Sequence, residues 1–275
     1  MGLVKKILIN IIPPRTFKSV IKKNGQDTFI KIIKGEHRMK VEIWSDFVCP
    51  FCYIGKRQFE IGLEQFEHKE EVEVLFRHFQ LDPYAKKNTG MDIHQVLSSK
   101  HGVPYEKAKV LNNQLKQKAK EVGLDYQFDT MIPTNSYDAL RLSYYAKEKG
   151  KIREFMERIL KAHFTDSLDI GDHATLAQLT SEIGLDGNEA LDVLANDQYS
   201  ENIAADRAEG SNIGIQGVPF YVVNDKYVIS GAQPSEVFLE TLQQVWKEEY
   251  ANRKVEEHKL ESSLEDYCSD GTCKF

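Results

Sequence analysis

The 275-residue chain has few cysteines, no long apolar run and no excess of positive charge. Its four cysteines are too few for a small secreted fold held together by disulfides. No run of about 18 apolar residues occurs, so stable membrane insertion is not expected. The net charge is -6, whereas a nucleic-acid-binding domain usually carries a basic face. The composition, 41% hydrophobic and 28% charged, is that of an ordinary globular protein with no nucleic-acid partner.

The first 38 residues are basic and precede the first predicted strand. The apolar stretch 7–12 is short, is interrupted by Pro13-Pro14, and lacks a small-residue cleavage site, so it is a poor signal peptide. The run Lys34-Gly35-Glu36 is compatible with a purine-rich ribosome-binding sequence shortly before Met39. We therefore expect residues 1–38 to be an upstream extension that is either not native or disordered. The alternative is a basic amphipathic arm that binds membrane surfaces.

Periodicity predicts strands at both ends of the fold and helices between them. Polar and apolar residues alternate in the strands, and apolar residues recur at helical spacing elsewhere. Strands are expected at 41–47, 72–81, 219–223 and 227–230; helices are expected at 52–68, through most of 92–214, and from about 235 to 249.

This order predicts an α/β protein with a thioredoxin-like fold and a large inserted α-helical domain. The two β-containing parts can pair into one sheet across the insertion. The expected divisions are a thioredoxin-like domain at 39–84 and 215–249, an inserted helical domain at 85–214, and a polar C-terminal tail at 250–275.

The first cysteine pair, Cys49 and Cys52, lies where a predicted strand runs into a predicted helix. A thiolate is the nucleophile in disulfide exchange, and free N–H groups and the helix dipole stabilise it at a helix N-terminus. We therefore expect Cys49 to attack a disulfide and Cys52 to resolve the mixed disulfide. Pro50 suits the first helical position because its missing N–H would be unsatisfied there.

Other residues near this pair have competing interpretations. Phe51 and Pro50 are the two residues between the cysteines of the motif. Asp46 has two interpretations: it tunes the pKa of the cysteine pair or transfers protons, or it is a polar group at the end of the strand. A zinc site would need Cys268 and Cys273 as further ligands. The strand-to-helix position favours redox chemistry over a metal, so we predict no metal site.

A second motif, Gly217-Val218-Pro219-Phe220, stands directly before a predicted strand. Proline is permitted at a strand start, and an ordinary trans peptide is the default for such a turn. The histidines form no ligand motif such as HExxH. Two of them, His101 and His163, are expected at the surface.

Together these segments resemble the thioredoxin superfamily and, more closely, DsbA-like thiol–disulfide oxidoreductases of the FrnE type. The resemblance covers about residues 40–246 and is carried by the segments 44–55, 79–83, 135–142, 163–165, 169–172, 214–220 and 230–234. It implies that Pro219 is cis and lies beside Cys49, and that Val218 offers backbone hydrogen bonds to a bound peptide or mixed disulfide. It also implies that the helical insertion forms a lid over the cysteine pair.

The second cysteine pair resembles a C-terminal pair found in one branch of this family. Four residues separate Cys268 from Cys273, and the Ser, Asp and Gly among them suit a turn. Our hypothesis is that this pair forms its own disulfide and exchanges electrons with Cys49 and Cys52. The alternative is a solvated tail disulfide without catalytic use.

The predicted function is protein disulfide exchange, with isomerase activity as one form of it. We expect no cofactor beyond a redox-active disulfide, a cytoplasmic location, and a monomer or homodimer. Expected partners are thiol- or disulfide-containing proteins or low-molecular-weight thiols, with glutathione as reductant or substrate. One alternative is a glutathione-dependent isomerase or transferase, against which the presence of Cys52 argues. The other is a redox-regulated chaperone or sensor that uses the helical face.

Overall fold

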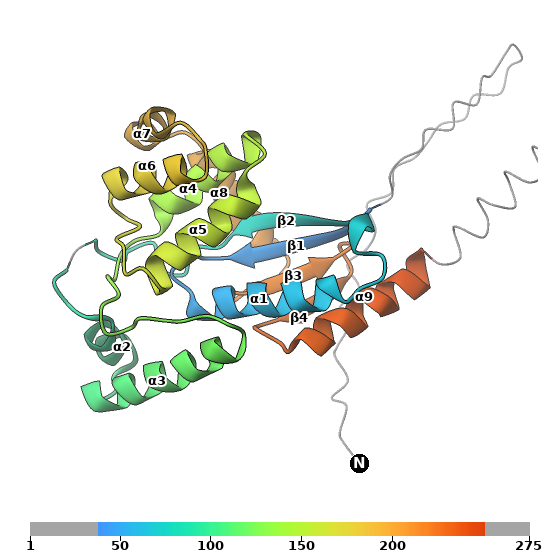
Figure 1. Cartoon of the computed structure of the whole chain (residues 1–275), viewed down its shortest axis with the longest axis horizontal. Coiled ribbons are helices and arrows are strands. Elements are labelled where there is room, and N and C mark those ends of the chain that lie inside the picture. The colour runs from blue at the N-terminus through green and yellow to red at the C-terminus, as the bar shows by residue number, and fades with distance from the viewer. Residues whose placement is uncertain (1–37, 88, 251–275) are drawn as a thin grey trace, which may run out of the picture.

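A four-stranded sheet lies at the centre of the computed structural model, which describes residues 38–87 and 89–250 (Figure 1). Its strand order is β2-β1-β3-β4. β1 (Met39–Ser45) pairs in parallel with β2 (Val72–His78) and antiparallel with β3 (Phe220–Val223), which pairs antiparallel with β4 (Tyr227–Ser230). The sheet therefore joins two parts of the chain that lie on either side of a long helical segment.

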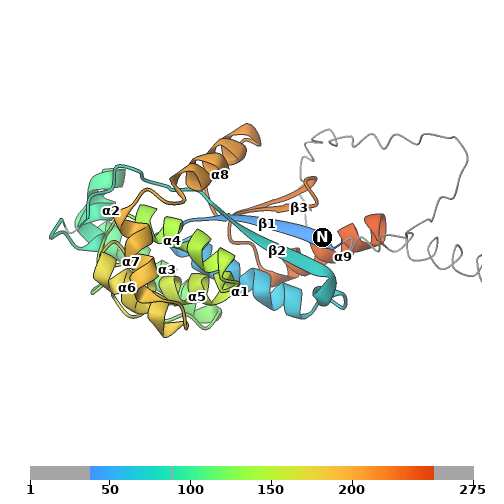
Figure 2. The same ribbon diagram turned by 90° about the horizontal axis from the view of Figure 1, so that it is seen from above.

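Helices cover both faces of this sheet. α1 (Pro50–Glu64) and α9 (Ser235–Glu249) lie on one face, and α8 (Ser200–Asn212) lies on the other (Figure 2). The contact between α1 and α9 is close, since a Cβ at Gly62 would lie 2.6 Å from the Ser235 carbonyl oxygen. Only glycine permits this approach.

The segment between β2 and β3 is largely helical and lies around the end of β1 and the start of α1 (Figure 1). Its helices before α8 are α2 (Ile93–His101), α3 (Tyr105–Glu121), α4 (Tyr137–Glu148), α5 (Ile152–Phe164), α6 (His173–Glu182) and α7 (Gly187–Ala195). A short 3₁₀ helix, η1 (Lys69–Glu71), precedes β2. Among the described residues, no helix is long and apolar enough to span a bilayer.

α8 is fixed to the sheet by the buried carboxylate of Asp206. It accepts hydrogen bonds from the His78 backbone N–H at 2.9 Å and the Tyr144 hydroxyl at 2.7 Å. Arg77 lies between this carboxylate, at 3.2 Å, and the buried carboxylate of Glu42, at 2.7 Å. The buried charges are therefore paired, as burial of ionised groups requires.

The predicted fold class and order of elements are confirmed. β2 ends at His78 rather than at Leu81, because the Leu81 N–H donates to the Asp46 carboxylate at 2.8 Å instead of continuing the ladder. The proposed divisions at 84/85 and 214/215 stay predictions. The hypothesis that residues 1–38 are an upstream extension concerns residues that, apart from Arg38, lie outside the described ones. The cysteine pair of the tail 250–275 lies outside the described residues as well.

Candidate active site

Cys49 and Cys52 stand at the beginning of α1. Cys49 is the N-cap residue in an extended conformation, and Pro50 opens the helix. Cys52 lies within the first turn, where its N–H donates to the Cys49 carbonyl oxygen at 3.0 Å. Both residues are free thiols and buried, with exposed fractions of 3% and 2%. The sequence-predicted pair is therefore held at a helix N-terminus, where a thiolate is stabilised.

The Val218-Pro219 segment lies beside the first of these cysteines. The Val218–Pro219 peptide bond is cis, as the resemblance implied. The Cys49 thiol donates a hydrogen bond to the Val218 carbonyl oxygen, with 3.5 Å between sulfur and oxygen. The fold thus brings together residues that are 169 positions apart in the sequence. Cys268 and Cys273 lie outside the described residues, so the structure places neither of them.

The surroundings of Cys52 change the pKa of its thiol. Burial raises the pKa of the Cys52 thiol well above its ordinary value, and the neighbouring Cys49 adds to the effect. Hydrogen bonds from the Asp46 backbone and the Ser45 side chain act in the opposite direction. Cys52 is therefore a protonated thiol at neutral pH, which suits a group that reacts second.

Asp46 directly follows the end of β1, and its carboxylate is fully buried. It accepts hydrogen bonds from the backbone N–H groups of Leu81, at 2.8 Å, and Val48, at 3.4 Å. Burial raises the pKa of Asp46, although these bonds and one from the Ser136 side chain oppose the rise. The carboxylate joins the turn before Cys49 to the chain after β2, so it supports the turn that leads into Cys49.

The two central residues of the motif have different surroundings. Phe51 is 46% exposed and stands at the surface. The Pro50 carbonyl oxygen accepts a hydrogen bond from the buried Tyr126 hydroxyl at 2.7 Å. Tyr126 belongs to the helical segment and stacks on Phe164, with 4.7 Å between ring centroids. The insertion therefore contacts the cysteine motif directly, through a residue that sequence reasoning missed.

A second missed contact joins the insertion to α1. The Glu157 carboxylate on α5 accepts hydrogen bonds from Lys56 at 2.6 Å, from Arg57 at 2.6 Å and from the Tyr53 hydroxyl at 2.7 Å. Burial alone would raise the pKa of Glu157, but the two cations and the hydroxyl outweigh it and lower the pKa to about 2. The carboxylate stays ionised and holds α5 against the first turns of the reactive helix.

The expectation that His163 lies at the surface is wrong, whereas His101 is exposed as expected. His163 follows Phe155 by eight positions and Ile159 by four on α5, so it belongs to the buried face of that helix. Burial lowers the pKa of His163 to about 4, with the nearby Asp169 acting against the change. The imidazole is therefore neutral at physiological pH.

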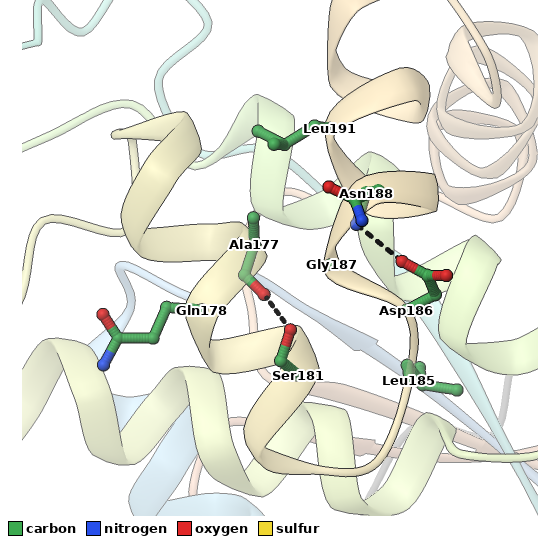
Figure 3. Close-up of a pocket in the computed structure, with 8 residues that line it drawn as sticks. All are labelled: Ala177, Gln178, Ser181, Leu185, Asp186, Gly187, Asn188 and Leu191. Carbon is green, nitrogen blue, oxygen red and sulfur yellow. Dashed lines mark hydrogen bonds between the residues drawn. The ribbon is translucent and has the colours of Figure 1, made fainter.

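A metal centre does not accompany the cysteines in the described part of the chain. No group of three or more His, Cys, Asp or Glu side chains there is arranged to hold a metal ion. A hollow of about 480 Å³ lies between α6 and α7 (Figure 3), and none of the residues that line it belongs to β1, α1 or the Val218-Pro219 segment. Its polar groups serve local structure: Asp186 accepts from the Asn188 N–H at 2.7 Å, and Ser181 donates to the Ala177 carbonyl at 3.0 Å (Figure 3).

The chain is similar to several known proteins over most of its length. It is 37% identical to a probable DsbA oxidoreductase from Streptomyces coelicolor, whose structure superimposes with a TM-score of 0.74 over 77% of this chain and 91% of that one. It is 28% identical to the uncharacterised protein YwbO of Bacillus subtilis (strain 168), over 72% of this chain and 92% of that protein. It also shares its fold with the cytosolic disulfide reductase DsbM of Pseudomonas aeruginosa, at 17% identity and a TM-score of 0.54, over 75% of this chain and 99% of that one.

Family assignment follows from the same region of the chain. Residues 40–243 match the family described as the DSBA-like thioredoxin domain. This match includes the sheet, both cysteines of α1 and the segment with the cis proline. The chain therefore belongs to the DSBA-like thioredoxin domain family and has the fold of DsbA-like thiol–disulfide oxidoreductases.

Proposed function

We propose that the protein exchanges disulfides with protein substrates through Cys49 and Cys52. The observation that carries this proposal is the position of the Cys49 sulfur, at the N-terminus of α1 and 3.5 Å from the Val218 carbonyl oxygen beside cis Pro219. A sulfur at a helix N-terminus is stabilised as the thiolate that attacks disulfides.

The exchange has two steps. The Cys49 thiolate attacks a substrate disulfide, forms a mixed disulfide and releases one substrate sulfur as a thiolate. Cys52 then loses its proton to solvent and attacks the Cys49 sulfur, which closes the Cys49–Cys52 disulfide and releases the second substrate sulfur. Two electrons pass from the cysteine pair to the substrate, and the reverse sequence oxidises a substrate dithiol.

The division of roles between the cysteines rests on their surroundings. Both cysteines are buried, but Cys49 lies beside the partly exposed Val218 and Phe51, whereas the pKa of Cys52 is raised. We infer that the substrate chain lies along Val218 and forms backbone hydrogen bonds there, next to the sulfur that it will react with. Phe51 offers an apolar surface to that chain.

Two single substitutions test the proposal. The Cys49→Ser variant should lose insulin disulfide reduction, and the Cys52→Ser variant should accumulate mixed disulfides with the substrate, visible by non-reducing electrophoresis and mass spectrometry. Refolding of scrambled ribonuclease distinguishes isomerase activity from simple reduction or oxidation. Wild-type activity in Cys49→Ser would overturn the proposal.

Glutathione chemistry is the second candidate function. A structure of DsbM from Pseudomonas aeruginosa carries glutathione, and that protein shares the fold at 16% identity. The buried second thiol favours the dithiol mechanism here, because a glutathione-dependent isomerase or transferase needs no resolving cysteine. Glutathione-dependent turnover by Cys52→Ser would favour the transferase function instead. Holdase activity that survives Cys49→Ser would favour a chaperone.

The tail cysteines extend the proposal beyond the described residues. We infer that Cys268 and Cys273 form a second redox pair that exchanges electrons with Cys49 and Cys52. Replacing both by serine should slow insulin or scrambled-ribonuclease turnover, and unchanged turnover would remove the relay. The FrnE-type assignment and the cytoplasmic location stay predictions, the second testable by cell fractionation.

A further inference from the structure

A buried tyrosine hydroxyl near the cysteine pair has no hydrogen-bond partner among the residues that the structure describes. Tyr221, on β3, is fully buried, and within residues 38–87 and 89–250 its hydroxyl has no partner. An unpaired buried hydroxyl costs free energy, so its presence in a native protein requires a reason. A phenylalanine would fill the same space without this cost, so packing alone does not explain the hydroxyl.

The hydroxyl lies against the face of α1 that carries Cys52. A Cβ at Gly55 would lie 2.6 Å from the Tyr221 oxygen. It would also lie 2.9 Å from Cγ of Pro219, so the cis proline borders the same space. The Phe59 ring lies farther along the helix, with 5.8 Å between its centroid and that of Tyr221. Because residues 52, 55 and 59 share one helix face, the hydroxyl is at the end of the ring that is nearer to Cys52.

The electrostatics of the two groups agree with this placement. Burial raises the pKa of Tyr221 well above its ordinary value, and the charges that Cys52 and Cys49 can carry raise it further. The hydroxyl therefore keeps its proton and is available as a donor. Burial also raises the pKa of Cys52, so the step in which this thiol reacts needs a group that stabilises its thiolate.

We propose that the Tyr221 hydroxyl is a catalytic hydrogen-bond donor to the Cys52 sulfur during resolution of the mixed disulfide. This inference rests on the proposed function. In this step the Cys52 proton passes to solvent, the Cys49–Cys52 bond forms, and the bond between Cys49 and the substrate breaks. The substrate sulfur leaves with the electron pair of the broken bond. Tyr221 stays protonated throughout and lowers the free energy of the Cys52 thiolate.

The test separates the two thiol steps in one reaction. The reduced full-length protein carrying Cys268→Ser and Cys273→Ser is mixed with dithiobis-nitrobenzoate in a stopped-flow instrument over a range of pH. Attack by Cys49 releases the first coloured thiolate, and closure by Cys52 releases the second. Mass spectrometry of the product identifies the Cys49–Cys52 disulfide.

The Tyr221→Phe variant should slow the second release about tenfold and raise its pH midpoint by about one unit, the size expected for one hydrogen bond to a charged group. The first release should keep its rate. A fluorinated tyrosine at position 221, a stronger donor, should lower the midpoint. The matched control is Tyr145→Phe, which removes the hydroxyl of a buried tyrosine on α4 bonded to Glu189 and should change neither release.

Two results would overturn the proposal. One is a second release in Tyr221→Phe with wild-type rate and midpoint. The other is an equal slowing of both releases, which would mean a general structural effect. Failure of the proposed function is distinct, because the wild-type pair would then release only one coloured thiolate and form no Cys49–Cys52 disulfide.

Discussion

The ion pairs between Glu157 and α1 allow a quantitative test of how the insertion is held to the reactive helix. Glu157→Gln keeps the size of the side chain and removes its charge. Lys56, whose side chain is only 8% exposed, would lose one of its two carboxylate partners and keep Glu60. Arg57 would likewise lose one of its two carboxylate partners in the described structure and keep Glu60 and the Tyr53 hydroxyl. The substitution therefore removes an attraction between α5 and α1 without opening a cavity.

The pKa of Glu157 sets the size of the effect. Its fall from the ordinary 4.5 to about 2 corresponds to an upper limit of about 3.4 kcal/mol, since one pKa unit equals about 1.36 kcal/mol. The side chain is 36% exposed, so solvent screens part of this attraction. We expect Glu157→Gln to lower the free energy of unfolding by about 1–2 kcal/mol at pH 7.

Urea unfolding at several pH values tests both the magnitude and its cause. Because the pKa of Glu157 is lowered on folding, its contribution is complete above about pH 4.5 and is lost as the pH falls toward about 2. The difference between wild type and Glu157→Gln should therefore shrink over this range. Glu154→Gln is the control, because this exposed residue on the same helix pairs only with the exposed Lys151 in the described structure. A difference that does not change with pH, or an equal loss in the control, would refute the reasoning.

Three further predictions concern residues that support the site. Asp46→Asn should gain stability relative to wild type as the pH rises from about 4 to about 8. The raised pKa of Asp46 means that the folded wild type binds this proton more tightly than the unfolded chain, so wild type loses stability as the proton leaves. A difference between the urea midpoints of the two proteins that is the same at both pH values would contradict this. Gly55→Ala should cost about 1–3 kcal/mol in urea unfolding, because the new Cβ would lie 2.6 Å from the Tyr221 hydroxyl and 2.9 Å from Pro219; a stabilised variant would show that the space is larger. Asp206→Asn should cost about 1–3 kcal/mol, because it removes the charge that faces Arg77 and replaces one of two acceptor oxygens by an NH2 group, while Arg77 keeps Glu42. Glu209→Gln, on an exposed partner of Arg77, is its control in the same assay.

Local sequence patterns located the cysteine motif and predicted the strands to within a few residues, although β2 ends at His78 and not at Leu81. Alternation located β1, and the change to helical spacing placed Cys49 at the N-cap of α1. The same spacing rule, applied to α5, would have placed His163 on the buried face with Phe155 and Ile159. Histidine as a residue type does not indicate whether a side chain is buried, whereas its position on the helix does.

The contacts that support the motif could not be predicted in this way. Tyr126 bonds to a carbonyl 76 positions earlier, and Glu157 pairs with cations about 100 positions earlier. Such pairings depend on how the insertion folds back onto α1, and no local periodicity encodes that. Tyr221 did carry a signal: it stands two residues after Pro219 in a strand, so alternation places both side chains on the face toward α1.

The asymmetry of the cysteine pair follows from what covers each side of the first turn of α1. On one side, Cys49 contacts the Val218 carbonyl oxygen and is followed by Pro50 and the half-exposed Phe51, although Cys49 itself is as buried as Cys52. On the other side, Cys52 lies among buried groups from β1 and β3, and its pKa is raised. Under the proposed function, these surroundings make Cys49 react first and Cys52 second. A substitution beside Cys52 should therefore change the second step of the exchange, and one at Val218 or Phe51 the first.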